Sequence, residues 1–216
     1  MSLLTKLFNY VLLTVSKYNI DESHGLSHAM DVLICANKIY NIESANNPTI
    51  KHHEKIIYVS SILHDMCDKK YMDQKQGIDD INDFILSLKD EQDINIITDS
   101  EKDVINKIVT TMSYSYVKQN GFPNLGEYQT AYNIVREADL LCAYDFDRCM
   151  IYQMYKKQFS LEDSYLDAVT LFDNRMFKHY DDGLLLTEYA KNNYLFLEHS
   201  SRLQMSRWNR LITKKL

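Results

Sequence analysis

Residues 56–63 read Ile-Ile-Tyr-Val-Ser-Ser-Ile-Leu, and His64 and Asp65 follow directly. This run offers no charged face to water, which is typical of a helix buried inside a protein. We therefore expect a buried central helix here, with an imidazole and a carboxylate at its end. Such groups are costly to bury unless something pairs with them.

Two more polar residues, His28 and Asp139, fall on apolar stripes with helix spacing. The residues that share these stripes are Val32, Cys35, Ala36 and Ile39 for His28, and Val135, Cys142 and Phe146 for Asp139. Together with His64 and Asp65, three separate segments would each direct a metal-ligating group into the protein. One shared cation explains this most simply, and two imidazoles with two carboxylates suit a transition metal or a hard divalent ion.

Each residue also has a simpler interpretation when it is taken alone. His64 and Asp65 are consistent with a helix end at which polar residues begin. Asp139 lies one turn after Arg136 and would pair with it. A lone His28 is more often a hydrogen-bonded core histidine than a ligand. The coincidence of all four residues favours the metal site.

Three short segments together resemble the signature of the HD-domain metal-dependent phosphohydrolases, in which a histidine precedes a distant His-Asp pair and a later aspartate. The corresponding segments are residues 24–32 (HGLSHAMDV), 63–65 (LHD) and 138–139 (AD). In that family a valine usually follows the first histidine by four residues. His28 and Val32 fit this spacing, so the resemblance selects His28 over His24 as the ligand.

Residues 61–71 (SILHDMCDKKY) resemble the branch of small stand-alone HD proteins that act on nucleotides. The likeness spans roughly residues 20–150. It weakens over residues 140–148, where many relatives carry a glycine-containing stretch, and the C-terminal segment also departs from the family. The resemblance implies an all-α HD-type helical bundle, with residues 1–216 as a single domain and residues 150–216 as a helical extension.

The resemblance also assigns roles. The ligands of the divalent cation would be His28, His64, Asp65 and Asp139. Asp68 matches the acidic position, three residues after Asp65, that positions or deprotonates the attacking water in relatives. Asp65 and Asp68 would thus act in catalysis.

The same resemblance implies that four residues contact the substrate. Lys69 and Lys70 fall where the family often keeps a lysine and would receive a phosphate, although solvated loop charges look the same in sequence. Asp73 is a looser candidate, because a second acidic residue follows the His-Asp pair in some nucleotidase relatives. His24, one turn before His28, would face the same site or else belong to the helix-capping region.

The implied activity is that of a phosphohydrolase that removes phosphate or pyrophosphate from nucleotides, such as nucleoside and deoxynucleoside triphosphates, with a metal-activated water. One set of ligands is evident, so one divalent cation is expected, and such ligands accept Mn, Mg, Zn, Fe or Ni. Two alternatives stay open. These are an HD-type phosphodiesterase and a catalytically inactive nucleotide-binding regulatory module.

Composition favours an all-α fold, because the 216-residue chain has only two prolines and five glycines and repeated 3.6-residue periodicity. Helices are expected at residues 3–18, 23–42, 50–66, 76–89, 99–111, 127–144, 146–159, 162–177 and 183–208. A connection is expected at 112–126. Tyr114 and Tyr116 would stack on a base there, although tyrosine is common throughout the chain.

Charge and hydropathy restrict the partners and the compartment. A net charge of −6 disfavours duplex nucleic acid, which needs a basic face, but not a small nucleotide. No run reaches transmembrane length, and residues 3–15 lack a signal-peptide cleavage site. Four cysteines without paired spacing suit a reducing compartment. We expect a cytoplasmic protein without a membrane partner, and a homodimer would be compatible with the sequence.

Overall fold

The computed structural model describes residues 1–214 and contains α-helices but no β-strand over that range. The α-helices are α1 (Leu3–Tyr18), α2 (Leu26–Asn46), α3 (Glu54–Leu63), α4 (Gln74–Ser87), α5 (Asp99–Thr111), α6 (Tyr114–Asn120), α7 (Gln129–Cys142), α8 (Phe146–Lys156), α9 (Leu161–Asn174) and α10 (Glu188–Ile212). Short 3-10 segments precede α2, α3 and α7 and follow α9. The expected all-α fold is confirmed.

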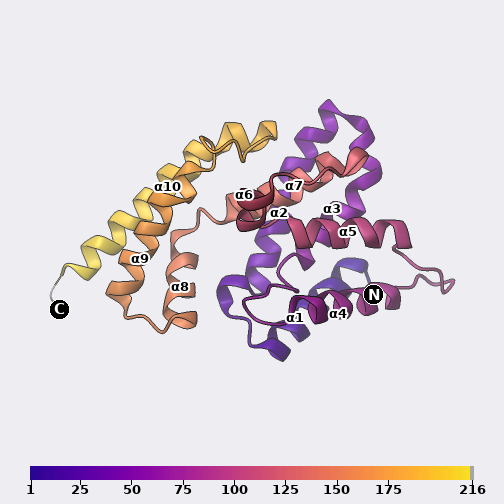
Figure 1. Cartoon of the computed structure of the whole chain (residues 1–216), viewed down its shortest axis with the longest axis horizontal. Helices are drawn as coiled ribbons and strands as arrows, with labels where there is room; N and C mark the ends of the chain where they lie inside the picture. The colour runs from indigo at the N-terminus through magenta and orange to yellow at the C-terminus, as the bar shows by residue number, and fades with distance from the viewer. Residues whose placement is uncertain (215–216) are drawn as a thin grey trace.

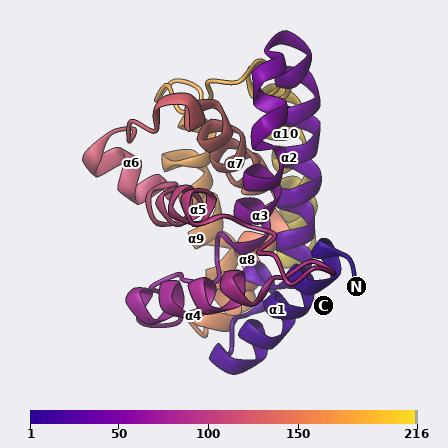
Figure 2. The same cartoon turned by 90° about the vertical axis from the view of Figure 1, so that its right-hand side faces the viewer.

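Helix α3 is the buried central helix that its sequence predicts. It packs against α1, α2, α5 and α7, and these helices surround it in Figures 1 and 2. Every residue from Ile56 to Leu63 except Tyr58 is buried. The helix ends at Leu63 with His64 as its C-cap, so the polar pair begins where the apolar run stops.

The hydrophobic interior consists of two clusters of buried residues. The larger cluster includes side chains from α1 to α7 and the start of α10. The smaller one lies among α8, α9 and α10 and consists of Phe146, Met150, Ala168, Phe172, Met176 and Met205. These three helices lie toward one end of the molecule, coloured orange to yellow in Figure 1. Because α10 also contacts α2 and α7, it joins the two clusters.

Helix α6 lies within the stretch that the sequence analysis expected to be a connection. Ser113 begins it by accepting a hydrogen bond from the backbone N of Tyr116 at 3.2 Å. Gly121 ends it with a φ of 74°, which glycine adopts without strain. Val117 is the one buried residue of this short helix, so it has no apolar stripe from which periodicity could predict it.

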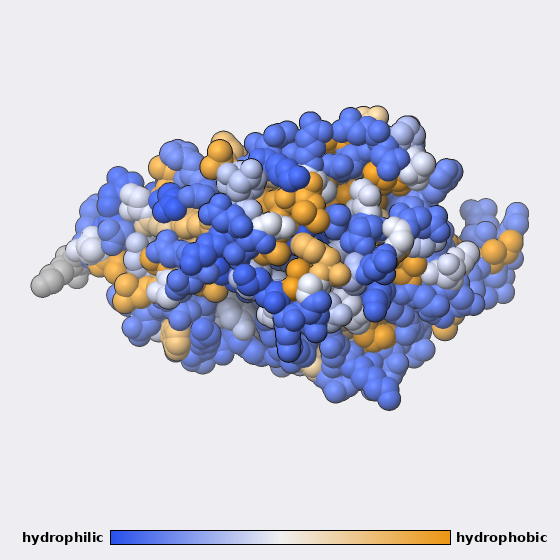
Figure 3. All heavy atoms as spheres, turned by 45° about the horizontal axis from the view of Figure 1, so that its top comes forward, coloured by the Kyte–Doolittle hydropathy of each residue, from blue (hydrophilic) through white to orange (hydrophobic). Residues whose placement is uncertain are grey.

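None of the described helices combines the length and the hydropathy that crossing a bilayer requires. On the face drawn in Figure 3, hydrophilic residues cover most of the surface, and apolar residues form a group near its middle and smaller groups elsewhere.

Helix α4 packs closely on the turn that follows the His-Asp pair. A Cβ atom added at Gly77 would lie 2.7 Å from Cys67 Cα and 2.8 Å from Met72 Sδ. We expect Gly77→Ala to lower the free energy of unfolding by about 1–3 kcal/mol through overpacking, although alanine is the better helix former. Urea unfolding checks this, with Asp79→Ala, an exposed position on the same helix, as the control. A Gly77→Ala protein as stable as wild type would contradict the close packing.

Candidate metal centre

Three helices bring the four candidate ligands together. His28 lies in the first turn of α2, His64 and Asp65 follow the end of α3, and Asp139 lies in the last turn of α7. These helices pack on one another in all three pairings. His28 and His64 are buried, and Asp65 and Asp139 are partly buried. The polar groups on the predicted apolar stripes therefore meet inside the protein.

The imidazole Nε2 atoms face each other and both carboxylates. His28 Nε2 lies 3.1 Å from His64 Nε2, 3.4 Å from Asp65 Oδ2 and 3.3 Å from Asp139 Oδ1. His64 Nε2 lies 3.1 Å from Asp65 Oδ2 and 3.7 Å from Asp139 Oδ1. Ligand atoms held about 2.1 Å from an ion lie about 3.0–3.4 Å apart in octahedral or tetrahedral geometry. The ligand atoms of His28, His64 and Asp65 all lie within 4.8 Å of one another and suit one divalent cation, and Asp139 Oδ1 lies beside both imidazoles as a further candidate ligand.

Two local observations support a cation at this position. The buried Asp65 Oδ2 has no hydrogen-bond partner among the described residues, and a buried anionic oxygen needs one. His64 Nδ1 donates a hydrogen bond to the backbone O of Ser61 at 2.9 Å. That bond holds the ring so that Nε2 points at the carboxylates, as the outer hydrogen bond of a metal-binding histidine does.

The electrostatics show how strongly the centre attracts positive charge. Burial alone would lower the pKa of His64, but Asp65 and Asp139 outweigh it and raise the pKa to about 9. Burial also lowers the pKa of His28. Burial would raise the pKa of both carboxyls, yet the facing imidazoles hold each pKa below its usual range. The carboxylates are thus ionised at neutral pH and require cationic neighbours.

The alternative pairing of Asp139 with Arg136 is wrong. Arg136 is fully buried, and its Nη2 lies 3.2 Å from Glu137 Oε1 and donates a hydrogen bond to the backbone O of Leu184. Asp139 lies instead against the imidazoles of His28 and His64. The alternative reading of His64 as a helix end is correct in itself, but the same residue also joins the cluster.

His24 and Asp68 form a second group with Asp65, whose ligand atoms lie within 4.8 Å of one another. A cationic side chain already lies among them. Lys70 Nζ is 3.2 Å from His24 Nε2 and 3.1 Å from Asp68 Oδ2. His24 Nδ1 lies 2.9 Å from the hydroxyl of Tyr71, which holds the ring in place. The ammonium group of Lys70 therefore lies at this second position.

Lys69 and Asp73, which were also expected to contact the substrate, lie in different places. Lys69 is exposed and lines the cavity beside the candidate ligands. Asp73 is exposed and is absent from the cavity lining. It is the N-cap of α4 and accepts a hydrogen bond from the backbone N of Gln76 at 3.0 Å. A capping role explains Asp73 without a substrate, because Asp is among the preferred N-cap residues.

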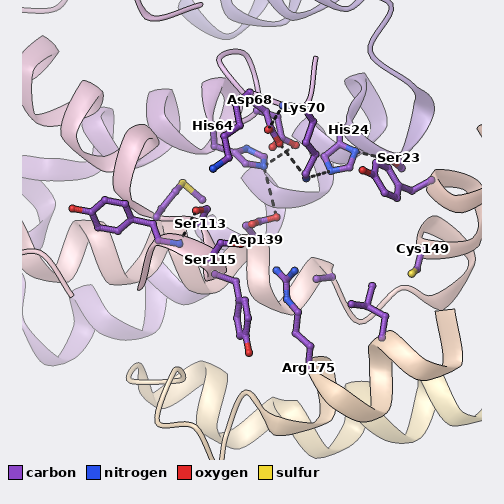
Figure 4. A pocket seen from close by; sticks show the side chains of 18 of the residues that line it. Ser23, His24, His64, Asp68, Lys70, Ser113, Ser115, Asp139, Cys149 and Arg175 are labelled. Carbon is purple, nitrogen blue, oxygen red and sulfur yellow. Dashed lines mark hydrogen bonds and ion pairs between the residues drawn. The ribbon is translucent and has the colours of Figure 1, made fainter. Parts of the chain in front are cut away.

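A cavity of about 560 Å³ opens beside the ligand set. His64, Asp65 and Asp139 lie on one side, and Arg148 and Arg175, which the sequence analysis did not single out, also line it. Figure 4 shows Arg175 directed toward Asp139 from the opposite wall. An isolated arginine gives no periodic signal, so only the packing of α8 and α9 against the rest of the protein reveals these two.

Comparison with protein-family models, with curated proteins and with solved structures finds no match for this chain. Its function is therefore inferred from the geometry and chemistry of the site itself.

The ligand set predicts metal content directly. After incubation with Mn²⁺ and removal of free ions, the wild-type chain should retain one ion, and His64→Ala should retain almost none because one of four ligands is lost. His199→Ala, an exposed histidine, is the matched control. Elemental analysis by mass spectrometry gives the stoichiometry, and unchanged metal in His64→Ala would show that the site is placed wrongly.

The position of Lys70 predicts that removal of its side-chain charge increases the number of bound metal ions. Removal of its ammonium in Lys70→Met would leave His24, Asp65 and Asp68 without their cation. We expect this variant to bind two Mn²⁺ ions at saturation, whereas wild type and Lys69→Met bind one. Titration followed by elemental analysis distinguishes these outcomes. A single ion in Lys70→Met would mean that the second group does not bind metal.

Proposed function

We propose that this chain is an HD-type metal-dependent phosphohydrolase that removes phosphate or pyrophosphate from nucleotides. The observation that carries the proposal is the meeting of His28, His64, Asp65 and Asp139, in the order of the HD signature, beside a cavity that also holds cationic side chains. In this proposal the all-helical fold is an HD-domain bundle, and α8–α10 are additional C-terminal helices.

A divalent cation held by these residues would polarise a phosphoryl oxygen and lower the pKa of a bound water. His28 and His64 would bind it through Nε2, because those nitrogens face the carboxylates. Asp65 and Asp139 would bind through the oxygens that lie nearest to the two rings. The hydrogen bond from His64 Nδ1 to Ser61 O keeps the ring in this orientation.

Asp68 is the residue that we expect to accept the proton of the attacking water. Its Oδ1 accepts a hydrogen bond from the backbone N of Lys70 at 2.9 Å, and its Oδ2 lies 3.1 Å from Lys70 Nζ. These contacts fix the carboxylate beside Asp65 while leaving lone pairs free for a proton, as general-base catalysis requires. The Lys70 ammonium would also offset phosphate charge.

Size and lining support a nucleotide as the substrate. The cavity volume of about 560 Å³ lies within the range of small-molecule sites, roughly 300–1,000 Å³. Tyr114 and Tyr116 line the cavity, and aromatic rings stack readily on bases. The guanidinium carbon of Arg175 lies 4.1 Å from the ring centroid of Tyr114, so Tyr116 is the better candidate for base stacking.

The dinuclear phosphodiesterase alternative has less support, because Lys70 lies where the second ion would bind, between His24 and Asp68. A regulatory module without catalysis would keep nucleotide affinity but show no turnover. Metal-free protein should therefore be incubated with Mn²⁺ and a panel of nucleoside and deoxynucleoside mono- and triphosphates. Chromatography would separate released pyrophosphate from orthophosphate. A chain that holds stoichiometric metal and turns over no nucleotide would rule out the proposed activity.

Replacement of Asp68 tests its role in the same assay. Asp68→Asn should lower kcat by about 10²- to 10⁴-fold, the usual contribution of a general base. Bound metal should not change, because Asp68 is not among the four ligands. Asp83→Asn, an exposed aspartate on α4, is the control. An unchanged kcat in Asp68→Asn would remove this residue from the mechanism.

A further inference from the structure

Two arginines in the cavity form no direct ion pair with a carboxylate among the described residues. Within residues 1–214, neither Arg148 nor Arg175 lies within 4.0 Å of a carboxylate oxygen, whereas Arg136 and Arg202 each pair with a glutamate. Unpaired guanidinium groups are ordinary on an open surface. These two are partly buried and line the cavity, where an uncompensated charge is costly.

Arg148 is fixed against the candidate metal ligands. It lies in the first turn of α8, its Nε donates a hydrogen bond to the backbone O of Ser23, and its Nη2 donates to His28 Nε2 at 3.0 Å. An imidazole Nε2 has one lone pair, so a His28 that binds metal leaves this Nη2 hydrogen free for an anion. The guanidinium is thus held by the backbone next to the candidate metal ligands, where the proposed function would place the attacked phosphate.

Arg175 approaches the same space from another helix. It follows the end of α9, and its guanidinium stacks on Tyr114 of α6 at 4.1 Å. Its Nε is buried and has no hydrogen-bond partner among the described residues. Burial lowers the pKa of Arg175, and the negative charge of Asp139 opposes that shift. In Figure 4 its side chain points into the cavity toward Asp139.

We propose that Arg148 and Arg175 form a polyphosphate subsite, which binds a phosphate adjoining the one held at the metal centre. Planar guanidinium groups bind phosphate oxygens through paired hydrogen bonds, and an anion between them supplies the missing counter-charge. The inference rests on the proposed function and narrows it. The substrate carries at least two linked phosphates, so nucleoside di- and triphosphates are favoured over monophosphates and over diesters with a single phosphate.

Arg148 belongs to α8 and Arg175 directly follows α9, and the packing of these two helices with α10 forms the smaller hydrophobic cluster. The candidate ligands His28 and Asp139 lie on α2 and α7, which contribute to the larger cluster. His64 and Asp65 lie directly after α3, which contributes to the same cluster. In this proposal Arg175 reaches the polyphosphate from the wall opposite Asp139, and Arg148 reaches it from beside His28. A change at Arg175 should alter the preference for polyphosphate without changing the metal content.

The test measures the binding of two inorganic anions to the Mn²⁺-loaded full chain by calorimetry. Tripolyphosphate is added as its Mg²⁺ complex so that it does not remove the bound ion, and orthophosphate is the reference. Wild type should bind tripolyphosphate at least about tenfold more tightly than orthophosphate. Arg175→Met should lose most of this preference, about tenfold, as expected for a charged hydrogen-bonding pair. Its orthophosphate affinity and metal content should stay unchanged.

Arg175→Gln, which keeps a polar side chain of similar length, is a second variant with the same expectation, in case Arg175→Met does not fold. Arg210→Met, at an exposed position on α10, is the matched control and should bind both anions as wild type does. Thermal unfolding of each variant separates lost binding from lost stability, since a purely structural Arg175 would change the melting temperature and leave the affinity ratio intact.

Equal affinity of wild type for the two anions would overturn the subsite. So would an unchanged ratio in folded Arg175 variants. If nucleotides are hydrolysed while the ratio is insensitive to Arg175, the proposed function stands and the subsite fails. If no nucleotide is hydrolysed but the Arg175-dependent preference is observed, the subsite stands and the catalytic proposal fails.

Discussion

Asp65 and Asp139 place two carboxylates against two buried imidazoles, and both lie at C-terminal helix ends. Each helix end adds the partial negative charge of its unpaired carbonyl groups. The region is therefore stable only with positive charge close by, and three sources of it converge there. They are the His64 imidazole, whose pKa is raised to about 9, the Arg148 guanidinium and, one step further out, the Lys70 ammonium. A divalent cation satisfies the same requirement with one ion.

This anionic centre is held in place by the way α7 is anchored. Residues Arg136 and Glu137 are both fully buried and lie just before Asp139. The Glu137 carboxylate accepts hydrogen bonds from the backbone N of Thr187 at 2.9 Å and from its Oγ1 at 2.7 Å. These bonds tie α7 to the start of α10. Loss of one partner in such a buried pair is strongly destabilising, so the orientation of Asp139 depends on contacts that lie outside the candidate site.

The sequence indicated those parts of the site that depend on local pattern. The uncharged run before His64 marks a helix that must be buried, and the stripe positions of His28 and Asp139 show which side of each helix faces inward. Arg148 and Arg175 could not be found in this way, because their position depends on how α8 and α9 pack against the main cluster. Asp73 shows that an aspartate near a motif can also cap a helix, a role that the motif alone does not reveal.

The candidate ligands and the two arginines of the cavity are held in place by different parts of the protein. The ligand set needs α2, α3 and α7 to stay in register, because each Nε2 lies within 3.7 Å of both carboxylates. The two arginines are held by the smaller cluster and by contacts to Ser23, His28 and Tyr114. If the two arginines form the proposed subsite, a substitution at Arg175 would therefore change anion binding at little cost to the centre. The candidate ligands are held by the packing of the larger cluster, whereas Arg148 and Arg175 are carried by the helices that follow it.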